Sequence, residues 1–198
     1  MGALHSKLML AAQNPADPVT RAFAGALETS LVALPMARPI GLDAVAFGAL
    51  LERYFPAAND LPELTAHAGS ASCQALRAEE HDDLLQLLLE HRSDGSDETL
   101  WLASAVAAAC LGGNHLWQDL GLANRQELSD LLKTRFSSLY ARNTGNMKWK
   151  KFFYKQLCER AGVNACRAPS CRVCDDYHNC FGSEDEGVSL PAATACKT

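Results

Sequence analysis

The chain has 198 residues, of which 48% are hydrophobic and only 7% aromatic. This length suits one domain, and abundant alanine and leucine favour helices over sheets. No apolar run approaches the roughly 20 residues of a membrane-spanning helix, and the first ten residues lack the features of a secretion signal, so we expect a cytoplasmic protein without a membrane partner. The net charge of −5 hides an asymmetry, because residues 125–176 carry eleven lysines and arginines against five acidic residues.

Capping residues and loop composition in the N-terminal half of the chain predict helices joined by loops. Residues 1–15 show no clear period, and we predict a flexible N-terminus there. Asp17 as an N-cap and Pro18 in the first turn predict a helix that continues to about Leu34. A second helix is predicted over residues 42–55, before a loop rich in Pro, Asn, Gly and Ser.

Two helices in the middle of the chain are expected, and one of them should form the centre of the fold. Residues 72–91 place leucines on one helical face and acidic residues on the other. Asp97 and Glu98 favour a helix N-terminus, and the following helix, residues 99–111, is apolar nearly all round. A helix without a polar face is typical of a buried position, so we expect this one to be central.

Two further helices precede the C-terminal segment. Asn124 and Glu127 have the spacing of a capping box, which predicts a helix as far as about Tyr140. The last helix is predicted over residues 147–160. Its apolar face contains Trp149, Phe152, Phe153 and Leu157, and its basic face contains Lys148, Lys151 and Lys155. The basic face is either solvated or attracts an anion or an acidic partner; so small a patch without an accompanying motif does not predict nucleic-acid binding.

Four of the eight cysteines form a cluster near the C-terminus. Cys166, Cys171, Cys174 and Cys180 have the spacing C-x4-C-x2-C-x5-C. Clustered thiols in a reducing compartment are typical of metal sites. Consecutive short gaps favour iron–sulfur ligation, whereas zinc modules usually carry two C-x2-C knuckles; spacing alone leaves structural zinc open. We therefore predict a metal centre in this segment.

The whole pattern predicts an all-α fold, a compact domain of about six helices with a cysteine-rich metal-binding loop. The helical domain spans residues 16–162 and the cluster-binding segment residues 163–182, followed by an acidic, then small and polar, disordered tail over residues 183–198. Among the remaining cysteines, Cys73 and Cys110 are expected to pack between helices, and Cys158 to be a small buried residue.

Two runs of sequence resemble the NifQ family. The first is MKWKKFFYKQLCE at residues 147–159, followed by CRAPSC and the other cysteines of the cluster; the second is HLWQDLGL at residues 115–122. The resemblance implies a protein that carries an iron–sulfur cluster, of the 3Fe-4S or 4Fe-4S type, able to incorporate molybdenum. It also implies donation of molybdenum for the nitrogenase iron–molybdenum cofactor, with the cofactor-assembly scaffold and the nitrogenase iron protein as partners.

In that family four cysteines bind the iron–sulfur cluster. The resemblance implies the same role for Cys166, Cys171, Cys174 and Cys180. Three thiolates would hold irons, and the fourth cysteine, His178 or His115 could cap molybdenum reversibly. A carrier is expected rather than an enzyme, because no nucleotide loop or nucleophile motif is evident. A zinc-stabilised interaction module without molybdenum transfer is the alternative.

Overall fold

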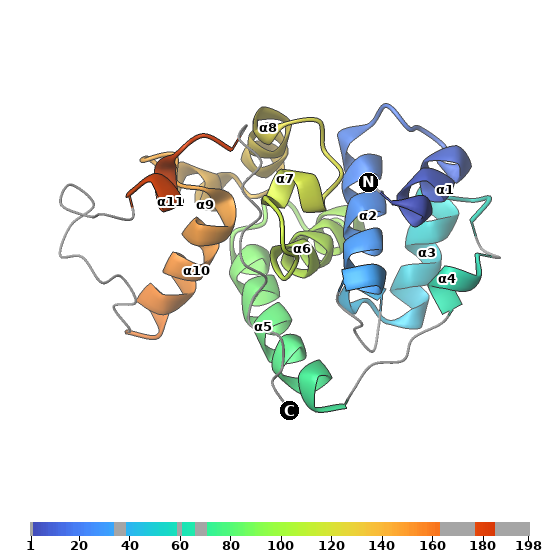
Figure 1. Ribbon diagram of the computed structural model, residues 1–198, viewed down its shortest axis with the longest axis horizontal. Coiled ribbons are helices and arrows are strands. Elements are labelled where there is room, and N and C mark those ends of the chain that lie inside the picture. Colours follow the sequence, from blue (N-terminus) through green and yellow to red (C-terminus); the bar gives the residue numbers. More distant parts are fainter. Residues whose placement is uncertain (1, 34–38, 59–60, 66–70, 163–176, 185–198) are drawn as a thin grey trace.

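The computed structural model describes residues 2–33, 39–58, 61–65, 71–162 and 177–184, and every regular element in these ranges is a helix (Figure 1). The predicted all-α class is confirmed for this part of the chain. The α-helices are α1 (Ala3–Ala11), α2 (Pro18–Glu28), α3 (Ala44–Tyr54), α4 (Pro62–Thr65), α5 (Ala71–Glu90), α6 (Asp97–Cys110), α7 (Leu116–Asp119), α8 (Arg125–Arg135), α9 (Ser137–Arg142), α10 (Trp149–Arg160) and α11 (Tyr177–Phe181). A π-helical stretch (Thr29–Ala33) prolongs α2, and a 3-10 turn spans Pro39–Gly41.

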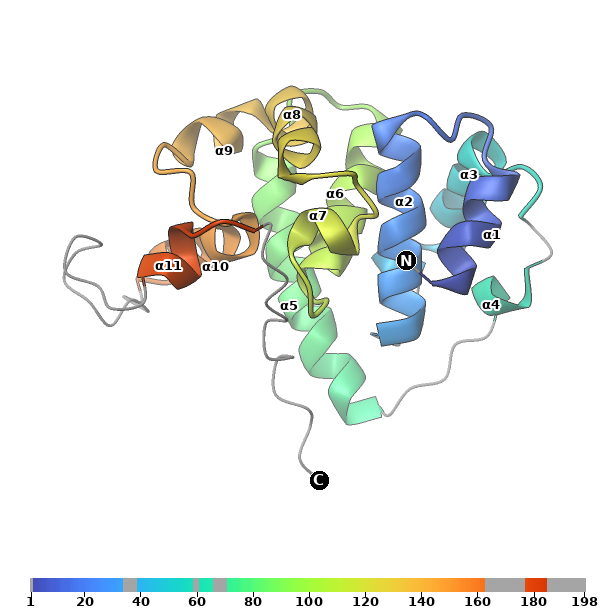
Figure 2. The same cartoon turned by 45° about the horizontal axis from the view of Figure 1, so that its top comes forward.

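Helix α6 forms the centre, between α2 and α5 (Figures 1 and 2). The side chain of Ser96 caps its N-terminus by accepting a hydrogen bond from the amide of Thr99 at 3.2 Å, and all residues from Trp101 to Cys110 are buried. The central position predicted from its apolar sequence is therefore confirmed. The burial of Cys110 agrees with its predicted packing role.

The predicted start of α2 is also confirmed. The carboxylate of Asp17 accepts hydrogen bonds from the amide and the hydroxyl of Thr20, at 3.1 and 3.0 Å. Further along α2, a Cβ atom on Gly25 would lie 2.2 Å from the backbone carbon of Leu120. Only glycine permits this approach, which sets the segment after α7 directly against α2.

The N-terminus differs from the prediction of a flexible segment over residues 1–15. Helix α1 forms there and packs on α2. Leu4 and Leu8 are buried, one turn apart, whereas Leu10 is 90% exposed. Because apolar residues occur on both faces of α1, the sequence shows no helical period, and contact with α2 supplies the stability that a nine-residue helix lacks alone.

The helix predicted from Asn124 to about Tyr140 is broken in two. Phe136 leaves helical geometry, with φ −137° and ψ 52°, and its side chain is fully buried. Ser93 makes the break possible, because its amide donates to the carbonyl of Arg135 at 2.8 Å and its hydroxyl accepts from the amide of Ser137 at 3.1 Å. Ser93, which is distant in sequence, thus takes the place of helical hydrogen-bond partners at Arg135 and Ser137. A local sequence pattern does not reveal such a contact.

Helix α10 lies against α5 and buries the predicted apolar face. Trp149, Phe152 and Phe153 are buried and their rings contact one another, with centroids 5.8–5.9 Å apart. The sequence predicted about six helices; the excess comes from α1 and from pieces too short for periodicity to detect. In the ranges that the structure describes, no helix combines the length and the apolar character needed to cross a bilayer.

Candidate metal centre

The structure describes one of the four predicted cysteine ligands. Cys180 lies in α11 and its side chain is half-buried against the hydrophobic core. Cys166, Cys171 and Cys174 belong to residues 163–176, outside the described residues. Within the described ranges no group of three or more His, Cys, Asp and Glu side chains is arranged to hold a metal. The four-cysteine ligand set therefore stays a prediction.

Helix α11 is attached to the start of α10. The amide of Lys148 donates a 2.7 Å hydrogen bond to the carbonyl of Cys180, which joins two segments distant in sequence. Within α11 the rings of Tyr177 and Phe181 stack with centroids 4.7 Å apart. The backbone of Cys180 is thus held beside the basic helix that the sequence singled out.

Arg125 forms a second attachment. Its guanidinium pairs with Glu184 at 2.5 Å and donates to the carbonyls of Asn146 and Met147 at 3.0 and 2.8 Å. The sequence assigned Glu184 to a disordered tail, yet its side chain is only 5% exposed. A buried carboxylate requires a hydrogen-bonding partner, and the guanidinium of Arg125 is that partner for Glu184. The same guanidinium also connects α8 with the turn before α10.

His115 lies next to this attachment. It is only 5% exposed, and it lines a cavity of about 10 Å³ together with Lys148, Lys151, Asn179 and Glu184. Its Nε2 atom has no hydrogen-bond partner in the part of the chain that the structure describes. Burial lowers the pKa of His115 below its ordinary value of 6.5; nearby Glu184 raises it, and Lys148 lowers it. The imidazole is therefore neutral at pH 7 and keeps a nitrogen lone pair.

His178, the other histidine proposed as a molybdenum ligand, has a different environment. It lies in α11 and is exposed, with its ring edge-on to that of Tyr177 at 6.2 Å between centroids. Of the two histidines, the structure thus brings His115 into a buried position beside the segment that carries Cys180. Neither observation tests ligation.

The segment around His115 is held by a buried ion pair that the sequence did not reveal. Lys150 Nζ lies 2.6 Å from Asp119 Oδ2 and donates to the carbonyl of Gly112 at 2.8 Å. Asp119 also accepts from the amide and side chain of Asn114, at 3.1 and 2.9 Å. A Cβ atom on Gly112 would lie 2.4 Å from Asp119 Oδ2, so the absence of a side chain at this position leaves room for the carboxylate of the ion pair.

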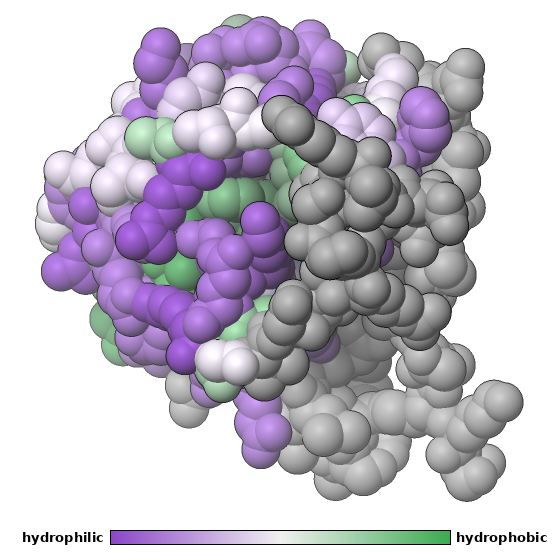
Figure 3. All heavy atoms as spheres, turned by 90° about the vertical axis from the view of Figure 1, so that its left-hand side faces the viewer, coloured by the Kyte–Doolittle hydropathy of each residue, from purple (hydrophilic) through white to green (hydrophobic). Residues whose placement is uncertain are grey.

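The lysines of α10 therefore have unequal roles. Lys150 is buried and paired, whereas Lys151 and Lys155 are exposed and Lys148 is half-buried. Lys155 lies 3.6 Å from Glu159 in an exposed pair. Figure 3 shows the end of the molecule that carries α9 and α10, where hydrophilic side chains surround small hydrophobic hollows. Two lysines of the predicted basic face, Lys151 and Lys155, are therefore accessible to solvent.

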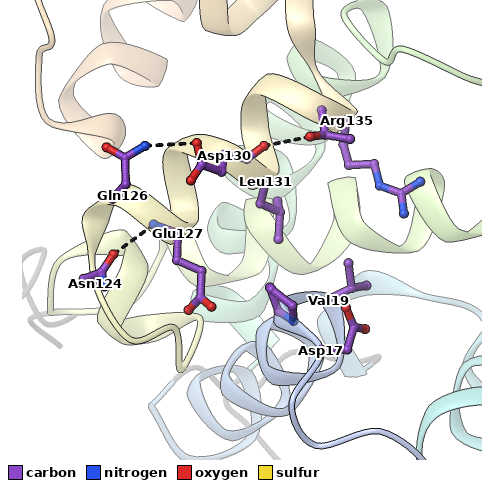
Figure 4. Close-up of a pocket in the computed structure, with 10 residues that line it drawn as sticks. Asp17, Val19, Asn124, Gln126, Glu127, Asp130, Leu131 and Arg135 are labelled. Atoms are coloured by element: carbon purple, nitrogen blue, oxygen red, sulfur yellow. Dashed lines mark hydrogen bonds between the residues drawn. The ribbon is translucent and has the colours of Figure 1, made fainter.

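Two wider pockets lie away from His115. One, of about 550 Å³, opens between the start of α2 and α8, where Asp17 and Val19 face Glu127, Leu131 and Arg135 (Figure 4). The other, of about 480 Å³, lies between the turn after α9 and α10 and includes Phe181. Neither contains one of the predicted site residues.

Comparison with known proteins covers most of the chain. The family model described as NifQ matches residues 20–182. "Protein NifQ" of Azotobacter vinelandii is 45% identical over 152 residues, 73% of this chain and 78% of the relative. "Protein NifQ homolog" of Sinorhizobium fredii is 40% identical over 150 residues, 75% of this chain and 64% of the relative. "Protein NifQ" of Rhodobacter capsulatus is 34% identical over 150 residues, 76% of this chain and 79% of the relative.

No solved structure matches the chain significantly. The sequence comparisons agree with the resemblance carried by residues 115–122 and 147–180, and the matched range extends it towards the N-terminus as far as residue 20, in α2. Asp119, Lys150 and Arg125, whose roles emerged only from the structure, all lie within the matched range. The chain belongs to the NifQ family.

Proposed function

We propose that this protein is a metallocluster carrier that donates molybdenum for assembly of the nitrogenase iron–molybdenum cofactor. Cys166, Cys171, Cys174 and Cys180 would hold an iron–sulfur cluster, and molybdenum is its cargo. The single observation that carries the proposal is membership of the NifQ family, which connects the chain with nitrogenase cofactor biosynthesis. A thiolate-bound iron–sulfur cluster supplies sulfides that bind molybdenum.

The donor set suits such a cluster. The four thiols occur in one short stretch, and soft thiolates are the usual ligands of iron–sulfur clusters. The carbonyl of Cys180 accepts a hydrogen bond from the amide of Lys148, the residue before α10, and Lys151 lies in the first turn of that helix. Positive groups around the site favour thiolates and offset the charge of an anionic cluster.

The proposed role is transfer between proteins, in the cytoplasm, without catalysis. The partners would be the cofactor-assembly scaffold and the nitrogenase iron protein. The exposed lysines Lys151 and Lys155 lie close to the cluster segment in sequence and would attract an acidic partner surface. This arrangement accounts for a basic segment in an otherwise acidic chain.

Anaerobic purification followed by metal analysis tests the proposal. We expect a brown protein that contains iron, acid-labile sulfide and molybdenum, with an electron paramagnetic resonance signal of the cluster. Cys180→Ser should lose iron, while Cys158→Ser, a thiol of α10 outside the ligand set, should retain it. A colourless protein with one zinc would instead identify a zinc-stabilised module, and turnover of a small substrate would identify an enzyme.

A further inference from the structure

We propose that the pocket between α9 and α10 is a docking site for a partner protein, whose docked segment presents a carboxylate next to an apolar side chain. The pocket has a volume of about 480 Å³ and lies between the turn after α9, the side of α10 and Phe181 of α11. Every residue that lines it belongs to the part of the chain that the structure describes. The inference goes beyond the proposed function, because it requires no bound metal.

Arg142, the last residue of α9, is the group that would bind the carboxylate. Its Nη1 atom donates to Gln156 Oε1 at 3.1 Å, and it makes no ion pair with any residue in the described ranges. A guanidinium has five N–H donors in one plane and binds a carboxylate through two parallel hydrogen bonds. Because Gln156 is buried, the contact holds the guanidinium in place before a partner arrives.

Apolar side chains form the inner wall of the pocket. Met147 and Phe152 are buried there, and Phe181 is half-buried beside them. An apolar centre with a polar rim and an anchoring arginine is the usual composition of a strong contact point in a protein interface. A pocket of this size suits organic groups such as the side chains of a peptide. A small inorganic anion at Arg142 would leave the apolar wall without a contact.

The charges around the pocket favour an acidic partner. Lys155 is exposed on one wall, and Glu159 is the one acidic residue among those that line the pocket. The carboxylate of Glu159 is already shared between Gln156 Nε2 at 2.7 Å and Lys155 Nζ at 3.6 Å. Residues 125–162 carry nine lysines and arginines against three acidic residues. Such a basic region attracts an acidic surface and accelerates its association.

Fluorescence anisotropy with the full chain tests the proposal, using a labelled hexapeptide in the order Glu-Glu-Leu-Phe-Glu-Glu as the probe. We expect Arg142→Ala to weaken binding at least about fivefold, the loss that marks an energetically important interface residue. Arg142→Lys should recover only part of this loss, because an ammonium keeps the charge but not the planar fork. Thr144→Trp should also weaken binding, since Thr144 lines the pocket and a larger side chain would fill it with every charge in place.

Lys133→Ala is the matched control, because Lys133 is an exposed cation of α8 that does not line the pocket. It should leave binding unchanged. Two altered peptides separate charge from apolar contact: glutamine in place of each glutamate should abolish binding, and serine in place of the leucine and phenylalanine should weaken it at least about fivefold. Amide spectra of the ¹⁵N-labelled protein locate the contact, and the intact peptide should shift the signals of Thr144 and Gly145, which line the pocket.

Three results would overturn the inference. They are failure of the peptide to bind at millimolar concentration, equal binding by Arg142→Ala, Thr144→Trp and Lys133→Ala, and equal binding of the serine-substituted peptide. Displacement of the peptide by sodium molybdate at equal concentration would also overturn it and would identify a small-anion site. The iron content of the same preparations tests the proposed function separately, because peptide binding by an iron-free protein would support docking while refuting the cluster.

Discussion

The Asp119–Lys150 ion pair offers the sharpest test of how the site is held. The two side chains are 3% and 10% exposed, and the carboxylate receives Lys150 Nζ at 2.6 Å as well as two donors from Asn114. Asp119→Ala would leave the Lys150 ammonium with the carbonyl of Gly112 as its described acceptor. The variant therefore creates a buried charge without a counter-charge.

Removing one partner of a buried ion pair costs about 3–5 kcal/mol, because the remaining ion keeps its desolvation penalty. In a chain of this length each kcal/mol lowers the Tm by about 2–4 °C, so we expect a fall on the order of 6–20 °C. Replacing both residues, Asp119→Leu with Lys150→Met, should recover much of the loss, since no buried charge remains. We therefore predict that the effects of substitutions at Asp119 and Lys150 on the free energy of unfolding are not additive.

Thermal and urea unfolding followed by circular dichroism measure these differences on the protein as isolated. Lys155→Ala is the control, since Lys155 and Glu159 form an exposed pair at 3.6 Å that should contribute less than about 0.5 kcal/mol. If Asp119→Ala were no more destabilising than Lys155→Ala, the pair would not have the stabilising role assigned to it. A double variant less stable than Asp119→Ala would also contradict the reasoning.

Other contacts in the structure give four further predictions. Gly25→Ala should destabilise the protein by about 1–3 kcal/mol or more by forcing a Cβ against the backbone of Leu120, whereas Gly48→Ala, with open space around the new Cβ, should not lower the urea midpoint. Arg125→Ala should lower the free energy of unfolding by about 1.5–3 kcal/mol and reduce iron retention, and Arg125→Lys should restore little, because an ammonium cannot reproduce the guanidinium fork. Burial raises the pKa of the Cys110 thiol to about 12, so mass spectrometry should find it alkylated by iodoacetamide only after unfolding in urea; native alkylation as fast as at Cys158 would contradict this. Burial lowers the pKa of His5 below 6.5, so the unfolded chain binds more protons and the free energy of unfolding should fall as the pH drops from 6.5 through the folded pKa; an equal slope in His5→Gln would refute the assignment.

The sequence alone determined the features that depend on near neighbours. The Asp17 cap, the apolar character of α6 and the aromatic face of α10 are all readable within a few turns of chain, and the structure confirms each of them. The cysteine spacing predicts a metal segment by the same local reasoning, and this stays a prediction because Cys166, Cys171 and Cys174 lie outside the described residues. Local rules were sufficient wherever the interacting atoms are close in sequence.

Only the tertiary structure decided what depends on distant partners. Lys150 has no predicted role in the sequence, because its partner Asp119 is 31 positions away. Glu184 was predicted to lie in a disordered tail, because its partner Arg125 is 59 positions away. The burial of His115 and the exposure of His178 likewise depend on contacts between distant segments. Burial and charge pairing are set by which surfaces meet, and the free energy of those contacts is absent from any local window of sequence.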